Sequence, residues 1–528
     1  MIPNLLKKFL FPLHLAFIVL FSMAVMDKAT PAGAGLANDS VAYIAGARSI
    51  LQGTGYSDIW LDSTLEPITH YPPLLSIVLS AIGLAGIDPL RSVRVLNILL
   101  FGSNTLLIAL VGYQLSRSKW ISLWLAALFL LNSSLLRVSL YAMSEPLFLT
   151  LCLLAFLAFF LALEQNYKPS WLLLTGVFTG LSVLARYSGL ALVPAFGLLL
   201  LLAPLDLKQK GKNLLYFLSP IALAVGAWFL RNKLVASSFT NRTLEIHPIT
   251  LDNVLPGIYN LSRIFLPLDQ IREPIFNSGV WNLILLGVLL CMVVGTIVLL
   301  LRIMTGKEAS TAANAVTTLL VFFFSYLGSI FFSISFFDNS TKFQDRILAP
   351  AVIVFFILAG LVFQKTAALF EKTKLVKLSR GVVAASMIGS ILFSFAGEAE
   401  AMKIFSTEGQ GYASWKYHDS AILAAIRDLP QDVSIYTNSP PAVYLVTERS
   451  SRVIPTKVDP VSNTNRPDYE QDIEKMVAQI NNGEAVLALL NTNDIENSSD
   501  AGSIESIITR LNSLKKTGDA ELFGVSLP

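Results

Sequence analysis

The sequence contains little charge, cysteine or histidine. Only 14% of its 528 residues are charged, whereas a soluble domain typically has about 25%. The two cysteines, Cys152 and Cys291, lie in long apolar runs, which excludes a disulfide framework or a thiolate zinc site. Four scattered histidines without an HExxH motif argue against a histidine-rich metal centre, and a net charge of +3 argues against a nucleic-acid partner.

Apolar residues make up 54% of the chain. Stretches of about 17 or more residues without Asp, Glu, Lys or Arg recur along it, and each can cross a bilayer as a helix. The stretch 71–87 begins with Tyr71-Pro72-Pro73, so we expect a short interfacial helix there. The remaining stretches predict an α-helical polytopic membrane protein of about eleven spans, at 9–26, 95–116, 120–136, 146–163, 169–185, 187–205, 213–230, 274–301, 309–337, 347–364 and 381–397.

The distribution of basic residues supports this count. With the N-terminus in the cytoplasm, Lys and Arg are about threefold denser in the cytoplasmic loops than on the opposite side. A twelfth span at 71–87 would place the basic loops 208–212 and 365–380 outside. The stretch 9–26 is expected to be an anchor, because it is long for a signal peptide and lacks a small-residue cleavage site. We expect a multi-pass protein of the plasma (inner) membrane whose C-terminus lies outside.

Two regions are predicted. Residues 1–397 form a transmembrane module with a first exoplasmic loop at 27–94, where Asn38 or Asp39 can cap a helix that ends near Gly53. Residues 398–528 have the composition of a soluble domain, and their alternating elements predict a small α/β layer. The odd number of spans places this domain on the exoplasmic side. Its predicted elements are helices near 419–428, 441–447, 468–481 and 502–514 and strands at 433–436 and 485–490.

Charged residues gather at the predicted outer ends of the spans. Each could reach the headgroups as an isolated snorkelling side chain. Together, on the same side as Asp39, they favour an anionic ligand such as a lipid-linked phosphate. The apolar runs themselves carry no charge, which disfavours an ion-coupled carrier. The residues are Arg91, Arg94, Arg137, Glu145, Arg186, Arg231 and Arg346.

An ordered set of motifs over about residues 1–400 resembles a known family. The motifs are Asn38-Asp39-Ser40-Val41-Ala42-Tyr43, Gly53-Thr54-Gly55-Tyr56, His70-Tyr71-Pro72-Pro73-Leu74, Tyr141-Ala142-Met143-Ser144-Glu145-Pro146-Leu147-Phe148, Leu184-Ala185-Arg186-Tyr187-Ser188-Gly189-Leu190 and Asp345-Arg346-Ile347-Leu348-Ala349-Pro350. Together they resemble the membrane glycosyltransferases of the GT-C superfamily. Within it, they are similar to the branch of protein O-mannosyltransferases and lipid A aminoarabinose transferases.

The resemblance implies a cell-envelope enzyme that moves a hexosyl or pentosyl group, with inversion, from a polyprenyl-phosphate donor to a glycan, lipid or protein acceptor outside the cytoplasm. A hydroxyl acceptor needs a base, for which we expect Asp39; the alternative is a helix cap. Arg346 and Arg186 are expected to bind the donor phosphate. Glu145 is expected to orient an arginine or the acceptor, with helix capping as its alternative.

The sugar pocket and the cofactor are less constrained. Tyr43, His70 and Tyr71 are candidates to line the pocket, although aromatic residues also anchor helices at the interface. Many family members have two adjacent acids in the first loop, whereas Asn38 and Ser40 flank Asp39 here. We therefore predict no metal ligands and no certain cofactor, with a divalent cation left open.

Two other classes of function compete with the transferase. A lipid-linked-glycan ligase or polymerase would use a long glycan on a pyrophosphate carrier and would need more cations. A membrane carrier should show broken spans or inverted repeats, which are not evident. No GxxxxGK[ST] loop occurs, so a nucleotide-sugar donor has no support.

Overall fold

The computed structural model describes residues 4–62, 65–239, 246, 248–305, 310–337, 343–371, 374–457, 466–493 and 501–525. The chain divides into two compact units. The first, unit 1, comprises Met1–Ala29, Thr69–Leu75 and Val95–Ser406, and unit 2 comprises Thr30–Ile68, Ser76–Arg94 and Thr407–Pro528. Unit 2 therefore combines most of the first loop with the C-terminal region. The division of the sequence at 397/398 stays a prediction.

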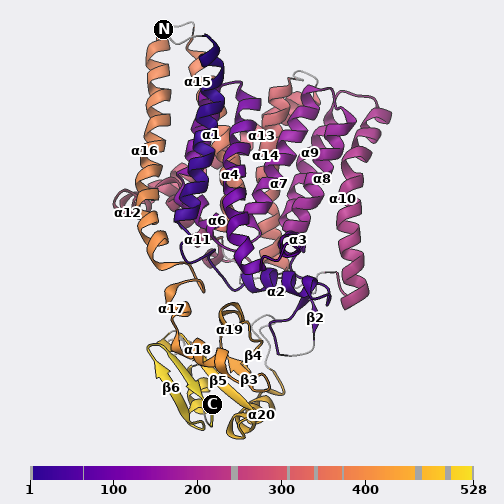
Figure 1. The fold of residues 1–528 in the computed structure, drawn as a ribbon. Coiled ribbons are helices and arrows are strands. Elements are labelled where there is room, and N and C mark those ends of the chain that lie inside the picture. The colour runs from indigo at the N-terminus through magenta and orange to yellow at the C-terminus, as the bar shows by residue number, and fades with distance from the viewer. Residues whose placement is uncertain are drawn as a thin grey trace. The chain divides into compact units, whose positions relative to one another are not determined.

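Long helices make up unit 1 (Figure 1). Side-chain caps begin several of them: Ser118 caps α5, Asn132 caps α6 and Asp206 caps α10. Proline in the first turn begins α7 and α8. The helices that lie in unit 1 for all or most of their length are α1 (Asn4–Lys28), α4 (Pro89–Ser116), α5 (Lys119–Leu130), α6 (Ser133–Leu140), α7 (Glu145–Glu164), α8 (Pro169–Ala185), the 3₁₀ helix η1 (Tyr187–Ala191), α9 (Leu192–Leu202), α10 (Leu207–Ala236), α11 (Leu251–Phe265), α12 (Asp269–Asn277), α13 (Val280–Met304), α14 (Thr311–Phe336), α15 (Asp345–Leu369) and α16 (Val376–Glu408).

Eight helices in the described part of the chain are long and apolar enough to cross a membrane. A ninth span results if α5 and α6, which are bent by 59°, count as one. These nine lie at nine of the predicted spans. The predicted spans 169–185 and 187–205 fall on the shorter apolar helices α8 and η1–α9. The total of eleven therefore stays a prediction.

Two boundaries differ from the expected ones. The expected span 274–301 begins too early, inside the last residues of α12. The membrane helix α13 begins at Val280, because Gly279 with φ +76° separates it from α12. The stretch 71–87 contains α3 (Leu74–Gly83), ten residues that begin after the two prolines.

Close packing in unit 1 depends on small and aromatic residues. Gly176 and Gly180 on α8 face α10, where a Cβ at Gly176 would lie 2.2 Å from the carbonyl oxygen of Phe217. Such small residues four apart let two membrane helices approach closely. Phe156 of α7 contacts Phe196 and Phe322 edge to face, and this interior holds α7, α9 and α14 together.

Unit 2 contains the first-loop elements and an α/β layer. The first-loop elements are α2 (Ser40–Leu51), the two-stranded pair β1 (Ser57–Asp58) and β2 (Glu66–Pro67), and most of α3. The C-terminal elements are α17 (Trp415–His418), α18 (Ala421–Asp428), β3 (Ser434–Thr437), α19 (Pro440–Thr447), β4 (Arg452–Val453), α20 (Tyr469–Asn481), β5 (Ala485–Leu490), α22 (Ala501–Ile508), β6 (Ser513–Thr517) and β7 (Ala520–Phe523).

The C-terminal strands form one mixed sheet in the order β4-β3-β5-β7-β6. Strand β3 is parallel to β4 and β5, whereas β7 is antiparallel to β5 and β6. Alternate residues of β5 enter two cores: Val486 packs with α18 and α19, and Leu487 packs with α20. Because β5 is buried on both faces, it reads as a continuous apolar run.

One C-terminal element was predicted too long. The expected helix at 502–514 ends at Ile508, and residues 513–517 form strand β6. The apolar spacing of Ile504, Ile507 and Leu511 suits a helix. The later residues instead pair with β7, a partner that local sequence does not reveal.

Candidate functional site

Glu145 lies at the start of α7 in unit 1. Pro146 follows it in the first turn of the helix, and only 3% of the Glu145 side chain is exposed. Neither carboxylate oxygen accepts a hydrogen bond from the described residues. The capping alternative is therefore not what the structure shows, and the charge is balanced by ion pairs instead.

Two arginines approach the same oxygen of Glu145. The Nη1 atom of Arg186 lies 2.7 Å from Oε1, and the Nη1 atom of Arg346 lies 3.9 Å from it. Arg186 also donates a 3.5 Å hydrogen bond to the hydroxyl of Ser144. The Arg186–Glu145 contact is short but not aligned as a hydrogen bond, so it is primarily an attraction between charges.

Local backbone structure brings these side chains together from distant parts of the sequence. Arg186 is an extended residue, with φ −152° and ψ 134°, at the break between α8 and η1. Arg346 is the second residue of α15, and its Nε donates to Gln344 Oε1 at 3.1 Å. The site therefore contains the starts of α7 and α15, whose helix dipoles favour an anion.

The net charge of this cluster is positive, because two guanidinium groups share one carboxylate. The side chains of Arg186 and Arg346 are 23% and 34% exposed. They can therefore meet a ligand as well as Glu145. Planar guanidinium groups bind phosphate oxygens in pairs. The cluster is suited to a phosphate.

Tyr326 is a residue of this site that sequence reasoning missed. It is 1% exposed on α14, and its hydroxyl donates to the carbonyl oxygen of Ile347, next to Arg346, at 2.8 Å. Its ring stacks on Phe148 and Phe322. A tyrosine inside an apolar run carries no local signal for such a role. Its hydrogen bond fixes the first turn of α15.

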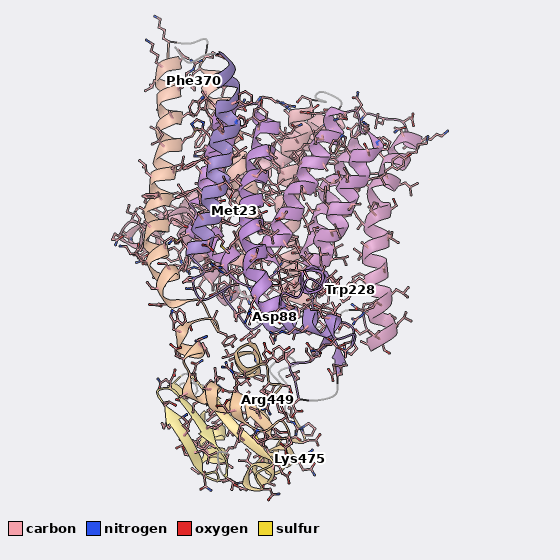
Figure 2. The ribbon with its side chains drawn as sticks, in the orientation of Figure 1. Met23, Asp88, Trp228, Phe370, Arg449 and Lys475 are labelled. Atoms are coloured by element: carbon pink, nitrogen blue, oxygen red, sulfur yellow. The ribbon has the colours of Figure 1, made fainter. Side chains whose placement is uncertain are left out.

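A second polar group lies beside Arg186 in the chain. The hydroxyl of Tyr187 donates to the carbonyl oxygen of Thr69 at 3.0 Å and accepts from Nε1 of Trp228 at 2.9 Å. Trp228 is labelled in Figure 2, and its ring centroid lies 5.2 Å from the guanidinium carbon of Arg231. These bonds hold the segment that precedes His70 against the ends of α8 and α10.

His70 and Tyr71 follow directly in unit 1. Their rings are 4.4 Å apart at 52°, and both are half-buried. The structure thus places two predicted pocket residues on the segment that Tyr187 holds through Thr69. Tyr187 itself is the residue after Arg186, the candidate for binding the phosphate. Their role in sugar binding stays a prediction.

Asp39 and Tyr43 belong to unit 2. Asp39 is half-buried and precedes α2, but its side chain makes no capping hydrogen bond, so the capping alternative is not what is seen. Tyr43 is 3% exposed, and its carbonyl oxygen accepts a 2.9 Å hydrogen bond from Ser76. The proposed roles of both residues stay predictions.

The first-loop carboxylates do not gather into a metal site in the described part of the chain. No group of three or more His, Cys, Asp or Glu side chains with suitable geometry occurs there. Asp58 and Glu66 are opposite one another in the β1–β2 pair. Burial raises the pKa of Asp58; the hydrogen bond from Trp60 lowers it, and the charge of Glu66 raises it further.

The comparisons with known proteins bear on this arrangement. Residues 68–228 match the family described as dolichyl-phosphate-mannose-protein mannosyltransferase. This segment contains His70, Tyr71, Glu145 and Arg186. No curated protein matches the chain at a significant level.

Solved structures share the fold at 12–13% identity. ArnT from Cupriavidus metallidurans bound to undecaprenyl phosphate matches with a TM-score of 0.56 and 12% identity, over 96% of this chain and 97% of that one. The Archaeoglobus fulgidus oligosaccharyltransferase matches with a TM-score of 0.56 and 12% identity, over 96% of this chain and 72% of that one. The arabinofuranosyltransferase AftD from Mycobacteria matches with a TM-score of 0.53 and 13% identity, over 97% of this chain and 41% of that one.

These comparisons confirm the expected resemblance. The chain has the fold of GT-C glycosyltransferases, and part of it matches the O-mannosyltransferase family. Its long apolar helices, together with these membrane neighbours, make it a multi-pass membrane protein.

Proposed function

We propose that the chain is a membrane glycosyltransferase that moves one sugar from a polyprenyl phosphate to an acceptor outside the cytoplasm, with inversion. The observation that carries this proposal is the Glu145–Arg186–Arg346 cluster, where two arginines share one buried carboxylate at the starts of two helices. In a chain with a GT-C fold, such a cluster suits the phosphate of a lipid-linked donor.

The phosphate is also the leaving group of the reaction. When the bond between the sugar C1 and the phosphate oxygen breaks, the phosphate changes from a monoanionic diester to a dianionic monoester. Fixed cations therefore attract the departing phosphate more strongly than the bound donor. This difference lowers the barrier.

The acceptor oxygen attacks C1 from the side opposite the phosphate, which inverts the anomeric centre. The hydroxyl proton passes to a base, for which we propose Asp39. Its half-buried carboxylate makes no capping hydrogen bond with α2. The products are the glycosylated acceptor, polyprenyl phosphate and protonated Asp39, which releases its proton to water.

The ligase alternative receives less support. The chain covers 97% of the aminoarabinose-transferase neighbour ArnT but 72% of the oligosaccharyltransferase. The described arginine cluster contains two cations around one carboxylate, which suits one phosphate better than a pyrophosphate. A single-sugar donor is therefore the first one to test.

The protein in lipid nanodiscs would be incubated with a panel of polyprenyl-phosphate sugars, a pyrophosphate-linked oligosaccharide and candidate acceptors, and free polyprenyl phosphate would be measured by mass spectrometry. We expect release from one monophosphate donor. Release from the oligosaccharide donor alone would favour the ligase, and no release from any donor would overturn the proposal.

The role of the arginines can be tested separately by titrating a short-chain polyprenyl phosphate. We expect Arg346→Ala to weaken binding about tenfold to a hundredfold, with Arg346→Lys intermediate, because lysine keeps the charge and loses the paired donors. Arg302→Ala is a matched control, since Arg302 is an exposed arginine near the end of α13. If the unmodified protein and all three variants bind the polyprenyl phosphate with equal affinity, Arg346 is not part of the site.

A further inference from the structure

Helix α19 of the C-terminal layer is joined to the first loop directly at its end, through Glu448, and indirectly at its start, where Ser439 bonds to Tyr412 and Tyr412 bonds to the loop. All residues involved belong to unit 2. We call this set of contacts the α19 bracket; it comprises Asn38 and Arg48 from the loop, and Tyr412, Ser439, Tyr444 and Glu448 from the C-terminal region. The loop residue between the two sides of the bracket is Asp39, followed by α2.

The first side of the bracket lies immediately before Asp39. The hydroxyl of Tyr412 donates to Oδ1 of Asn38 and accepts from the hydroxyl of Ser439, which precedes α19, at 3.3 Å. The backbones also pair, because Leu36 N donates to Gln410 O at 3.1 Å and Tyr412 N donates to Leu36 O at 2.9 Å. The residues on the N-terminal side of Asp39 are therefore fixed to the C-terminal layer.

The second side of the bracket is Arg48 on α2. Its guanidinium makes a paired contact with Asp88 at 2.9 and 3.0 Å and a third hydrogen bond to Glu448 at 2.8 Å. It also lies 5.6 Å from the ring centroid of Tyr444. Arg48 is 9% exposed, so leaving its guanidinium without these partners would be costly. The Glu448 side chain is 68% exposed, so its contact serves mainly to join α19 to α2.

The backbone at Glu448 has a conformation that is costly for a residue with a side chain. Glu448 ends α19 with φ +62°, a left-handed conformation that glycine adopts without strain. Asp88 alone would neutralise Arg48. A glutamate at this strained position adds a contact between α19 and α2.

A separate attachment holds the same layer farther along the loop. Arg452 donates to Asp62 at 3.0 Å and lies 5.7 Å from the ring centroid of Tyr436. Backbone bonds join Ser451 to Trp60 and Asp62. This attachment docks the layer without involving α2, so the bracket around Asp39 is not required for docking alone.

We propose that Tyr412 and Glu448 are positioning residues for Asp39, acting through Asn38 and Arg48. The inference rests on the proposed role of Asp39 as the base. The C-terminal layer then forms part of the reaction machinery, because it holds both ends of the segment that carries the carboxylate. A misplacement of about 1 Å can cost about a hundredfold in rate.

The test uses the full-length protein in nanodiscs, with turnover and hydrogen exchange as readouts. Tyr412→Phe removes one hydroxyl, and Glu448→Gly removes the carboxylate while relieving the backbone. We expect each to lower kcat about tenfold, with the donor KM changed less than about twofold, and to speed exchange over residues 36–51. Unchanged kcat in both variants would overturn the proposal.

Arg452→Gln is the matched control, because Arg452 has the same kinds of partner as Arg48 but contacts the loop at Asp62. We expect faster exchange over residues 57–62 and nearly normal kcat. If Arg452→Gln lowers kcat as much as Tyr412→Phe does, the effect is general destabilisation and the positioning role is wrong.

A double-mutant cycle separates this inference from the proposed function. If Tyr412 acts through Asp39, Tyr412→Phe should cause no further loss in an Asp39→Asn background. Independent, additive losses would overturn the positioning role while leaving the base intact. Full activity of Asp39→Asn would instead refute the base, and the exchange results would still show whether the bracket holds the loop.

Discussion

Replacing Glu145 by glutamine removes one negative charge from the proposed phosphate site and leaves its shape nearly unchanged. At an effective dielectric of about 20, the 2.7 Å and 3.9 Å contacts with Arg186 and Arg346 correspond to about 6 and 4 kcal/mol of attraction before desolvation. Both arginines are partly exposed, so solvent screening removes much of this attraction. We expect a net loss of about 1–3 kcal/mol in folding stability.

The same change should strengthen phosphate binding. A phosphate bound beyond the guanidinium groups would lie roughly 6–7 Å from Glu145, where the carboxylate repels it by about 1–2 kcal/mol after screening. Removing that repulsion corresponds to about tenfold higher affinity. Because the product phosphate is then held longer, we expect kcat to fall while product affinity rises.

The assay is a titration of short-chain polyprenyl phosphate, together with steady-state turnover and thermal unfolding. Glu164→Gln is the matched control, since Glu164 ends the same helix and pairs with the more exposed Arg117. We expect it to change none of the three readouts appreciably. Weaker phosphate binding in Glu145→Gln, comparable with Arg346→Ala, would refute the charge-balance reasoning and assign Glu145 to orienting the arginines.

The remaining predictions concern the base, the topology and the first loop. Asp39→Asn should lower kcat by about 10²- to 10⁴-fold with donor affinity unchanged, and near-normal turnover would exclude a general base there. A reporter active only outside the cytoplasm should be active when fused after residue 400 and silent after residue 210; the reverse pattern would contradict the proposed sidedness. Burial alone would raise the pKa of Asp88, but Arg48 outweighs it and holds that pKa below its ordinary 3.8. The stability from this pair should therefore be present above pH 3.8 and lost as the pH falls below it, and thermal unfolding should show a smaller acid-induced loss in Asp88→Asn.

Much of the candidate site could be proposed from sequence because its residues lie at motif positions beside helix ends. Glu145, Arg186 and Arg346 each adjoin the end of an apolar run, where a charge is conspicuous. Tyr326 and Tyr187 could not be found in this way, because a tyrosine in or beside an apolar run is common. Their hydrogen bonds to Ile347 and Thr69 depend on which helices become neighbours.

The sequence by itself determined the membrane character and most of the long apolar helices, because hydrophobic length and helix-end chemistry are local properties. Only the tertiary structure decided that two arginines share one oxygen of Glu145, and that a loop arginine at position 48 pairs with a glutamate 400 residues later. It also decided that residues 513–517 form a strand, because β7 supplies the partner. These outcomes depend on contacts between distant segments, for which no single stretch of the chain carries a signal.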